Sequence, residues 1–507
     1  MRRLDLVLAA PVLLGPAALA FAKGGYFDVP RLVAGVVACA LVIAVAVRDA
    51  RPVPRSALVA VGGLAALTAW TGLSILWAPI AGAASDDFQR VLLYLFYFVA
   101  AVAVLRPPEV RRLVEPVLLA GIVAAALYGL SERLLPGVFS LQALPSADNR
   151  LAWPLTYWNA MGALMGMGLV LAAWIPSRAA LATAPLLGLA CYLTFSRGAL
   201  GATAAGLAVL VALAPTLPQL HRVAVVAVSA ALAALATVPL SAVEAPDGSA
   251  GQGAAMIAVL AVLAAAAAWL APATTAAAPT APAASPTGPA APTGAPDASR
   301  HPTPAPPARD DRAARLAAPA HAAGRPAPTR AVAPRLPAVR WAAIGALVLA
   351  LVVTGIAVTR VERTGSGPAQ GANPSRLVSA QSNRYEYWQV ALSEFGSAPL
   401  QGGGSGSFRT DWLRERTIDE TVRDAHSLYF ETAAELGLVG LLALGVFVFG
   451  IVAMARRSPE AAGAIGALAV YAIHAGLDWD WEMPALTLVA LTLAARLATP
   501  DARPAAS

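Results

Sequence analysis

The sequence predicts an all-α integral membrane protein with about fourteen transmembrane helices and one large outer loop before a late span. Hydrophobic residues make up 58% of its 507 residues, and charged residues make up only 13%. Continuous apolar stretches of about 18 residues or more recur, and each can cross a hydrocarbon layer of about 30 Å as a helix. Barrel strands would instead alternate polar and apolar residues over about 10 residues, so helices are favoured.

The predicted spans form two groups. The first, a membrane domain over residues 1–271, holds 4–22, 29–47, 57–77, 88–105, 113–131, 157–175, 180–196, 198–214, 223–241 and 253–271. The second, over 341–499, holds 341–359, 428–454, 461–477 and 484–499, and a tail of 500–507 follows it. Arg2-Arg3 and Ala20-Phe21-Ala22 make the first span similar to a cleaved signal peptide. We expect the span to be retained, because the next apolar stretch follows after a short loop.

Arginines in the short connecting segments predict the orientation. If the N-terminus is cytoplasmic, the inner segments hold most of these arginines, among them Arg48, Arg111, Arg456 and Arg457. The sequence therefore predicts a multi-pass protein of the cytoplasmic (inner) membrane with both termini in the cytoplasm. Topogenic arginines also explain the net charge of +7, so no nucleic-acid partner is expected.

Two long segments separate the later spans. Residues 272–340 are rich in Ala, Pro and Thr, which predicts a disordered cytoplasmic linker. Residues 360–427 lie on the outer side and mix charges, glycines and aromatic residues. Helical spacing of Arg384, Trp388 and Phe395 predicts an amphipathic helix near 376–396. We expect a flexible glycine turn at 402–406 and a second helix that starts near Asp419 and continues into the span at 428.

Two arginines on the outer side are candidates for binding phosphate, because a guanidinium offers a planar, bidentate fork. Arg197 follows Ser196 at the start of a span, where helix amides would add to an anion site. The alternative is an arginine that snorkels to lipid headgroups. Arg384 shares a helix face with Trp388, and its alternative is a stacked surface pair. Together the arginines could clamp one pyrophosphate.

Further candidates surround the last spans. His426 lies where a helix enters the membrane, although an isolated interfacial histidine is usually structural. Glu435 lies about 13 Å further along that helix and should face the protein interior. Asp478 and Asp480 follow His474, and the simplest interpretation is solvated acids within an interfacial belt of Trp. A divalent ion would need a third ligand that is not evident, so no metal site is predicted.

In this order and spacing the motifs resemble the O-antigen ligase and polymerase superfamily. They comprise Ser196-Arg197-Gly198, then Arg384 and Trp388, Pro399-Leu400 with Gly402, Gly404, Gly406 and Phe408, and His426-Ser427 and Tyr429 with Glu435, Gly437 and Gly440. Tyr157-Trp158-Asn159 and Asp478 with Pro484 are similar to weaker features of the family. The resemblance covers about residues 150–440. The 272–340 insertion and the large number of spans depart from the family pattern.

The resemblance implies a GT-C-like membrane glycosyltransferase whose catalytic loop precedes a late span. Its donor would be a glycan on polyprenyl diphosphate and its acceptor a glycan or lipid hydroxyl, with membrane lipids around it and no cofactor. The implied mechanism is metal-independent. It maps catalysis to His426 and the pyrophosphate to Arg197 and Arg384, with Ser196, Asn159, Trp388, Glu435 and Asp478 in support.

Four functions remain open from the sequence. A ligase and a repeat-unit polymerase are both transferases, and the sequence does not separate them. A transporter or flippase of lipid-linked glycan is disfavoured, because the polar residues gather at one face rather than at the midplane. A non-catalytic scaffold for envelope assembly is the last alternative.

Overall fold

The computed structural model describes residues 3–48, 53–246, 248–272 and 382–500, which belong to one compact unit. These residues form helices and no named strand. The helices are α1 (Arg3–Phe21), α2 (Asp28–Arg48), α3 (Leu58–Ser74), α4 (Ala81–Val104), α5 (Pro108–Arg111), α6 (Val114–Leu134), α7 (Trp158–Trp174), α8 (Arg178–Ala182), α9 (Ala184–Leu193), α10 (Arg197–Leu213), α11 (Leu217–Leu235), α12 (Ala250–Trp269), α14 (Arg384–Ser397), α15 (Phe408–Glu415), α16 (Leu428–Arg457), α17 (Ala462–Ala475) and α18 (Pro484–Arg496).

The prediction of a helical membrane protein is confirmed. Within the described residues, seven helical segments are long and apolar enough to cross a membrane: Leu4–Phe21, Asp28–Arg48, Ala81–Val104, Pro108–Leu134, Leu217–Leu235, Ala250–Trp269 and Leu428–Arg457. Every other predicted span in this part of the chain overlaps a shorter helix or a pair of helices. The predicted span 341–359 and residues 273–340 of the predicted linker lie outside the described residues, so the total of fourteen stays a prediction.

Two spans begin earlier than predicted, for local reasons. The side chain of Thr216 accepts a hydrogen bond from the Gln219 amide, and Pro218 occupies the first turn, so α11 starts six residues before the apolar stretch. Helix α4 starts at Ala81 and includes Asp86 and Asp87 in its first turns. A prediction based on apolar stretches leaves out these two acids, although the Asp87 side chain is only 13% exposed.

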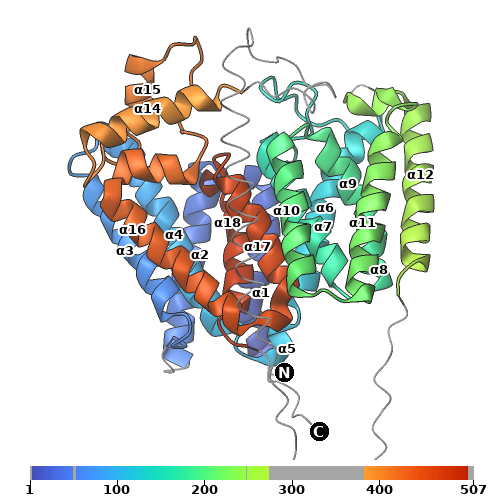
Figure 1. Ribbon diagram of the computed structural model, residues 1–507, viewed down its shortest axis with the longest axis horizontal. Coiled ribbons are helices and arrows are strands. Elements are labelled where there is room, and N and C mark those ends of the chain that lie inside the picture. The colour runs from blue at the N-terminus through green and yellow to red at the C-terminus, as the bar shows by residue number, and fades with distance from the viewer. Residues whose placement is uncertain (1–2, 49–52, 247, 273–381, 501–507) are drawn as a thin grey trace, which may run out of the picture. The chain divides into compact units, whose positions relative to one another are not determined.

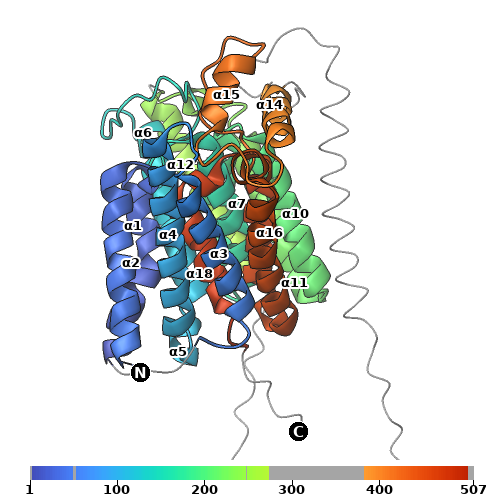
Figure 2. The same ribbon diagram turned by 90° about the vertical axis from the view of Figure 1, so that its left-hand side faces the viewer.

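The helices pack closely through small residues. Helix α16 lies along α3, and α17 lies along α10 and α7. A Cβ atom on Gly63 of α3 would lie 2.3 Å from the backbone nitrogen of Phe447 on α16. Such backbone approach is typical of membrane helices, whose association depends on van der Waals packing. Helices α14 and α15 lie at one end of this bundle, opposite the end where α5 and the start of α1 are found (Figures 1 and 2).

The segment before α16 forms a small core of its own. Tyr387 of α14, Phe408 and Trp412 of α15, and Ala425 and Ala434 are buried together there. The predicted helix near 376–396 is confirmed over Arg384–Ser397, and residues before 382 lie outside the described part of the chain. The glycine turn is also present, with Gly402, Gly404 and Gly406 at positive φ, but the expectation that it is flexible is wrong, because hydrogen bonds fix it to α16.

The predicted helix from Asp419 into the span is wrong. Helix α15 occupies Phe408–Glu415 instead, and the chain is irregular from Arg416 to Ser427. The Glu420 carboxylate accepts hydrogen bonds from Asn383 at 2.6 Å and Tyr387 at 2.7 Å. The Glu420 carbonyl oxygen accepts another from the Trp412 indole at 2.8 Å. These tertiary contacts hold the segment in its irregular conformation, and its β-branched residues have low helix propensity.

The orientation of the bundle can be tested by chemical labelling. With Cys39 and Cys191 replaced by alanine, a cysteine at Asp419, whose side chain is fully exposed beside α15, should react with an impermeant thiol reagent on intact cells. A cysteine at the exposed Arg112, next to α5, should react only after the cells are opened. The opposite pattern would reverse the predicted topology and remove the outer site.

Candidate active site

Asp478 is the centre of a buried polar network that joins segments far apart in the sequence. It follows α17 directly, and its exposed fraction is 0%. Its oxygens accept hydrogen bonds from the Tyr157 hydroxyl and the Asn159 amide, both at 2.6 Å, and from the Arg384 guanidinium. Asn159 also donates to the Tyr157 oxygen at 2.8 Å. The start of α7, the start of α14 and the α17–α18 connection therefore meet at one carboxylate.

Electrostatics keep this carboxylate ionised. Burial raises the pKa of Asp478, but the positive charge of Arg384 holds it below its usual value. Arg384 keeps part of its side chain accessible, with 24% exposed. Since a guanidinium has five N–H donors, Arg384 can bind Asp478 and still present donors to an anion.

His426 lies beside this network in an unusual conformation. Its φ is +52°, a value that is uncommon outside glycine and that concentrates at functional sites. Its ring lies against Tyr387, with centroids 5.0 Å apart, and edge-on to Trp479 at 6.5 Å. Nδ1 lies 3.0 Å from the Asp424 carbonyl oxygen. A carbonyl only accepts, so Nδ1 carries the proton and the neutral ring keeps a lone pair on Nε2.

Arg197 begins α10 near the same end of α17. Ser196, which precedes it, is buried and caps α10 by accepting a hydrogen bond from the Ala199 amide at 3.3 Å, so its hydroxyl has a structural role. A Cβ atom on Gly198 would lie 3.4 Å from His474 Nε2, four residues before Asp478. The half-buried Arg197 is thus anchored close to the segment that carries Asp478. Whether it shares one pyrophosphate with Arg384 stays a prediction.

The aromatic and acidic residues around the site differ from their simplest interpretations. Trp388 stacks on Phe430, with centroids 5.2 Å apart, while Arg384 binds Asp478, so the two do not form the surface pair that was the alternative interpretation of Arg384. The interpretation of solvated acids after α17 is wrong. Asp480 is fully buried and lies 2.5 Å from His474 Nδ1. The two aspartates thus have different partners, and the described residues contain no group of three placed to hold a metal ion.

Glu435 is buried, as expected, beside a break in α16. Its carboxylate accepts a hydrogen bond from the Phe408 amide at 3.3 Å, and Gly437 interrupts the helix with a φ of +61°. Loop 399–404 replaces the lost helical bonds. The backbone amides of Gly403 and Gly404 donate to the carbonyl oxygens of Ala434 and Glu435, both at 2.9 Å. The Leu438 amide donates to the Pro399 carbonyl oxygen at 2.8 Å. Loop 399–404 is therefore joined to α16 by backbone hydrogen bonds at the break in the helix.

Gly402 has no room for a side chain in this arrangement. Its φ is +75°, and an added Cβ would lie 2.3 Å from the Glu435 carbonyl. Gly402→Ala should lower the thermal unfolding temperature in detergent, because the left-handed conformation alone costs about 1–2 kcal/mol. Gly396→Ala is the matched control, since it adds a methyl group to α14 in open space and removes a glycine from a helix. Equal unfolding temperatures for both variants would contradict the close fit of the loop.

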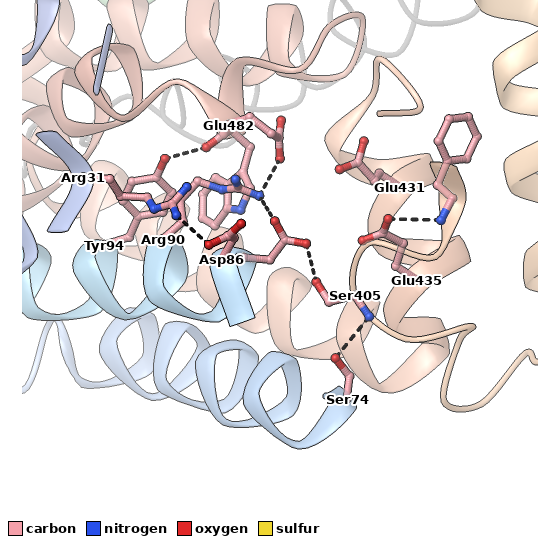
Figure 3. A network of polar contacts seen from close by, with 12 residues as sticks. Arg31, Ser74, Asp86, Arg90, Tyr94, Ser405, Glu431, Glu435 and Glu482 are labelled. Atoms are coloured by element: carbon pink, nitrogen blue, oxygen red, sulfur yellow. Dashed lines mark hydrogen bonds and ion pairs between the residues drawn. The ribbon is translucent and has the colours of Figure 1, made fainter. Parts of the chain in front are cut away.

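Sequence patterns missed several members of the site. Asp87, Arg90, Glu431 and Glu482 form a second polar group around a cavity beside α16, and Figure 3 shows Arg90, Glu431 and Glu482 there. The sequence did contain one indication of this group: Asp87 and Arg90 lie three residues apart in α4, a spacing at which an acid and an arginine can pair on one helix face.

Comparison with known proteins agrees with the motifs. Residues 330–445 match the family model described as O-antigen ligase. The match includes Arg384, Trp388, His426 and Glu435, whereas Asn159, Ser196, Arg197 and Asp478 lie beyond its limits. No curated protein matches the chain. The family match confirms, over residues 330–445, the resemblance of this multi-pass membrane protein to the O-antigen ligase and polymerase superfamily.

Proposed function

We propose that the protein is a membrane glycosyltransferase acting in cell-surface polysaccharide biosynthesis. It transfers a glycan from polyprenyl diphosphate to an acceptor hydroxyl at the outer face of the cytoplasmic membrane. One observation carries this proposal: Arg384 and His426, both within the residues that match the O-antigen ligase family model, lie around the buried Asp478. An anion-binding group and a proton acceptor are the two elements that this transfer needs.

Arg384 stabilises the leaving group in this proposal. As the bond between the anomeric carbon and the diphosphate oxygen breaks, the electron pair stays on the diphosphate and its charge grows. A guanidinium held in place by Asp478 needs no reorganisation to meet that charge, which makes it effective in a site that excludes water. Arg197 is the second candidate ligand for the same diphosphate.

His426 accepts the proton of the acceptor. The hydroxyl oxygen forms the new bond to the anomeric carbon, and its proton moves to the Nε2 lone pair, which the contact of Nδ1 with the Asp424 carbonyl leaves available. Direct displacement inverts the anomeric configuration.

A transfer assay tests the proposed function. Purified protein should consume polyprenyl-diphosphate glycan only when an acceptor is supplied, and a chelator should leave the rate unchanged. A single added glycan indicates a ligase, and products with increasing numbers of repeat units indicate a polymerase. A transporter or scaffold would leave the donor intact with every acceptor, and that result would refute the proposal.

A further inference from the structure

A cavity of about 40 Å³ lies beside the loop that carries His426, between α3, α4, α16 and the turn Asp480–Glu482. Its charged and hydroxyl lining includes Asp87, Arg90, Ser405, Glu431, Glu435 and Glu482 (Figure 3). Trp481 contributes an aromatic wall. None of these residues takes part in the network around Asp478.

Hydrogen bonds connect this cavity to the proposed active site. Asp87 accepts from Arg90 at 2.6 Å and from the Ser405 hydroxyl at 2.8 Å, and Arg90 reaches Glu482 at 3.4 Å. Glu431 accepts from the Ala425 amide at 2.8 Å. Since Ala425 immediately precedes His426, a group bound in the cavity lies next to the proposed base.

The cavity has one buried donor that the described residues do not match. Its carboxylates outnumber its one guanidinium, and burial raises the pKa of Glu482 to about 8 despite Arg90. The Arg90 side chain is only 9% exposed, yet its Nε has no hydrogen-bond partner among the described residues. Given its raised pKa, Glu482 is largely protonated at neutral pH, which shows that the lining disfavours negative charge. Arg90 Nε calls for a bound acceptor, and the carboxyl oxygens can accept from a bound donor.

A sugar hydroxyl meets this requirement, because it donates and accepts at once. A metal cation could not accept from Arg90, and the burial that raises the pKa of Glu482 also disfavours a phosphate. At about 10–15 Å³ for each water-sized group, the cavity has room for roughly three oxygens, which suits the hydroxyl edge of one sugar ring. The face of Trp481 offers an apolar surface to that ring.

We propose that this cavity is the acceptor subsite, which binds the hydroxyl edge of a neutral or amine-bearing sugar and excludes sugars that carry a carboxylate. Its acceptor role rests on the proposed glycosyl transfer. Because the lining disfavours negative charge, the donor diphosphate binds at Arg384 instead, and the two substrates approach His426 from different positions.

Saturation-transfer NMR on the full chain in lipid nanodiscs tests sugar binding without requiring transfer. The probes are glucose, galactose, mannose and glucosamine, with glucuronate as the carboxylate-bearing comparison. Neutral sugars and glucosamine should give signals well above that of glucuronate. Asp87→Asn and Glu431→Gln should weaken these signals about tenfold, as loss of a hydrogen bond to a charged group does. Glu415→Gln, an exposed change on α15, is the matched control and should leave them unchanged.

Equal signals from glucuronate, or signals that neither cavity variant changes, would overturn the subsite. If Asp87→Asn or Glu431→Gln lowers the unfolding temperature, Ser405→Ala replaces them, because it removes only a hydroxyl from the lining. It should also weaken the sugar signals. In the transfer assay, the cavity variants should raise the KM for the acceptor about tenfold and leave the KM for the donor unchanged. If transfer occurs but the cavity variants leave the acceptor KM unchanged, only the subsite is refuted. If sugars bind but no transfer occurs, only the proposed function is refuted.

Discussion

His426→Asn is expected to lower the rate of glycan transfer by roughly 10²–10⁴, the range for loss of general acid–base catalysis. Asparagine tolerates the positive φ of this position better than alanine, so the variant should keep the fold while it loses the imidazole lone pair. Donor binding should remain, because Arg384 and Asp478 are unchanged. Single-turnover transfer and donor binding, measured on the same preparation, separate the two effects.

The matched control is His221→Ala, which changes an exposed histidine in the first turns of α11. It should leave transfer unchanged. His474 does not serve as a control, since its buried contact with Asp480 makes it part of the packing. Full activity in a folded His426→Asn protein would remove the base from the mechanism.

Arg384→Lys is expected to reduce kcat/KM for the donor by roughly 10- to 100-fold, corresponding to about 1.5–3 kcal/mol for a hydrogen bond to a charged group. Lysine keeps the charge but loses the fork that lets one side chain bind Asp478 and phosphate together. Arg197→Lys should show a similar loss if both arginines bind one diphosphate. Donor kinetics at a fixed acceptor concentration measure both variants.

Arg414→Lys provides the comparison, because this α15 arginine has 72% of its side chain exposed. Its kinetics should match the unchanged protein. If Arg384→Lys behaves the same way, the guanidinium binds only Asp478 and another group must stabilise the diphosphate.

Local patterns predicted much of the helical fold, since long apolar stretches are a strong signal. Short motifs also singled out Arg384, His426 and Asp478 as candidates. The contacts among Asp478, Arg384 and Tyr157 could not be predicted, because Asp478 is 94 residues from Arg384 and 321 from Tyr157 in the sequence. Buried acids such as Asp480 looked solvated for the same reason. The helix predicted near Asp419 is absent because tertiary hydrogen bonds to Glu420 outweigh the local preference for a helix.

Membrane insertion of α16 depends on a segment made before it. Gly437 lies nine residues after Leu428, about 13 Å along the helix. In hydrocarbon, the backbone groups opened at this break would each cost several kcal/mol, so an isolated α16 would be a poor membrane span. Residues 399–404 are synthesised earlier and satisfy those groups. Biogenesis therefore requires the 399–404 loop and the helix to assemble together, and a lengthened 399–404 segment should cause degradation during assembly rather than a stable, inactive protein.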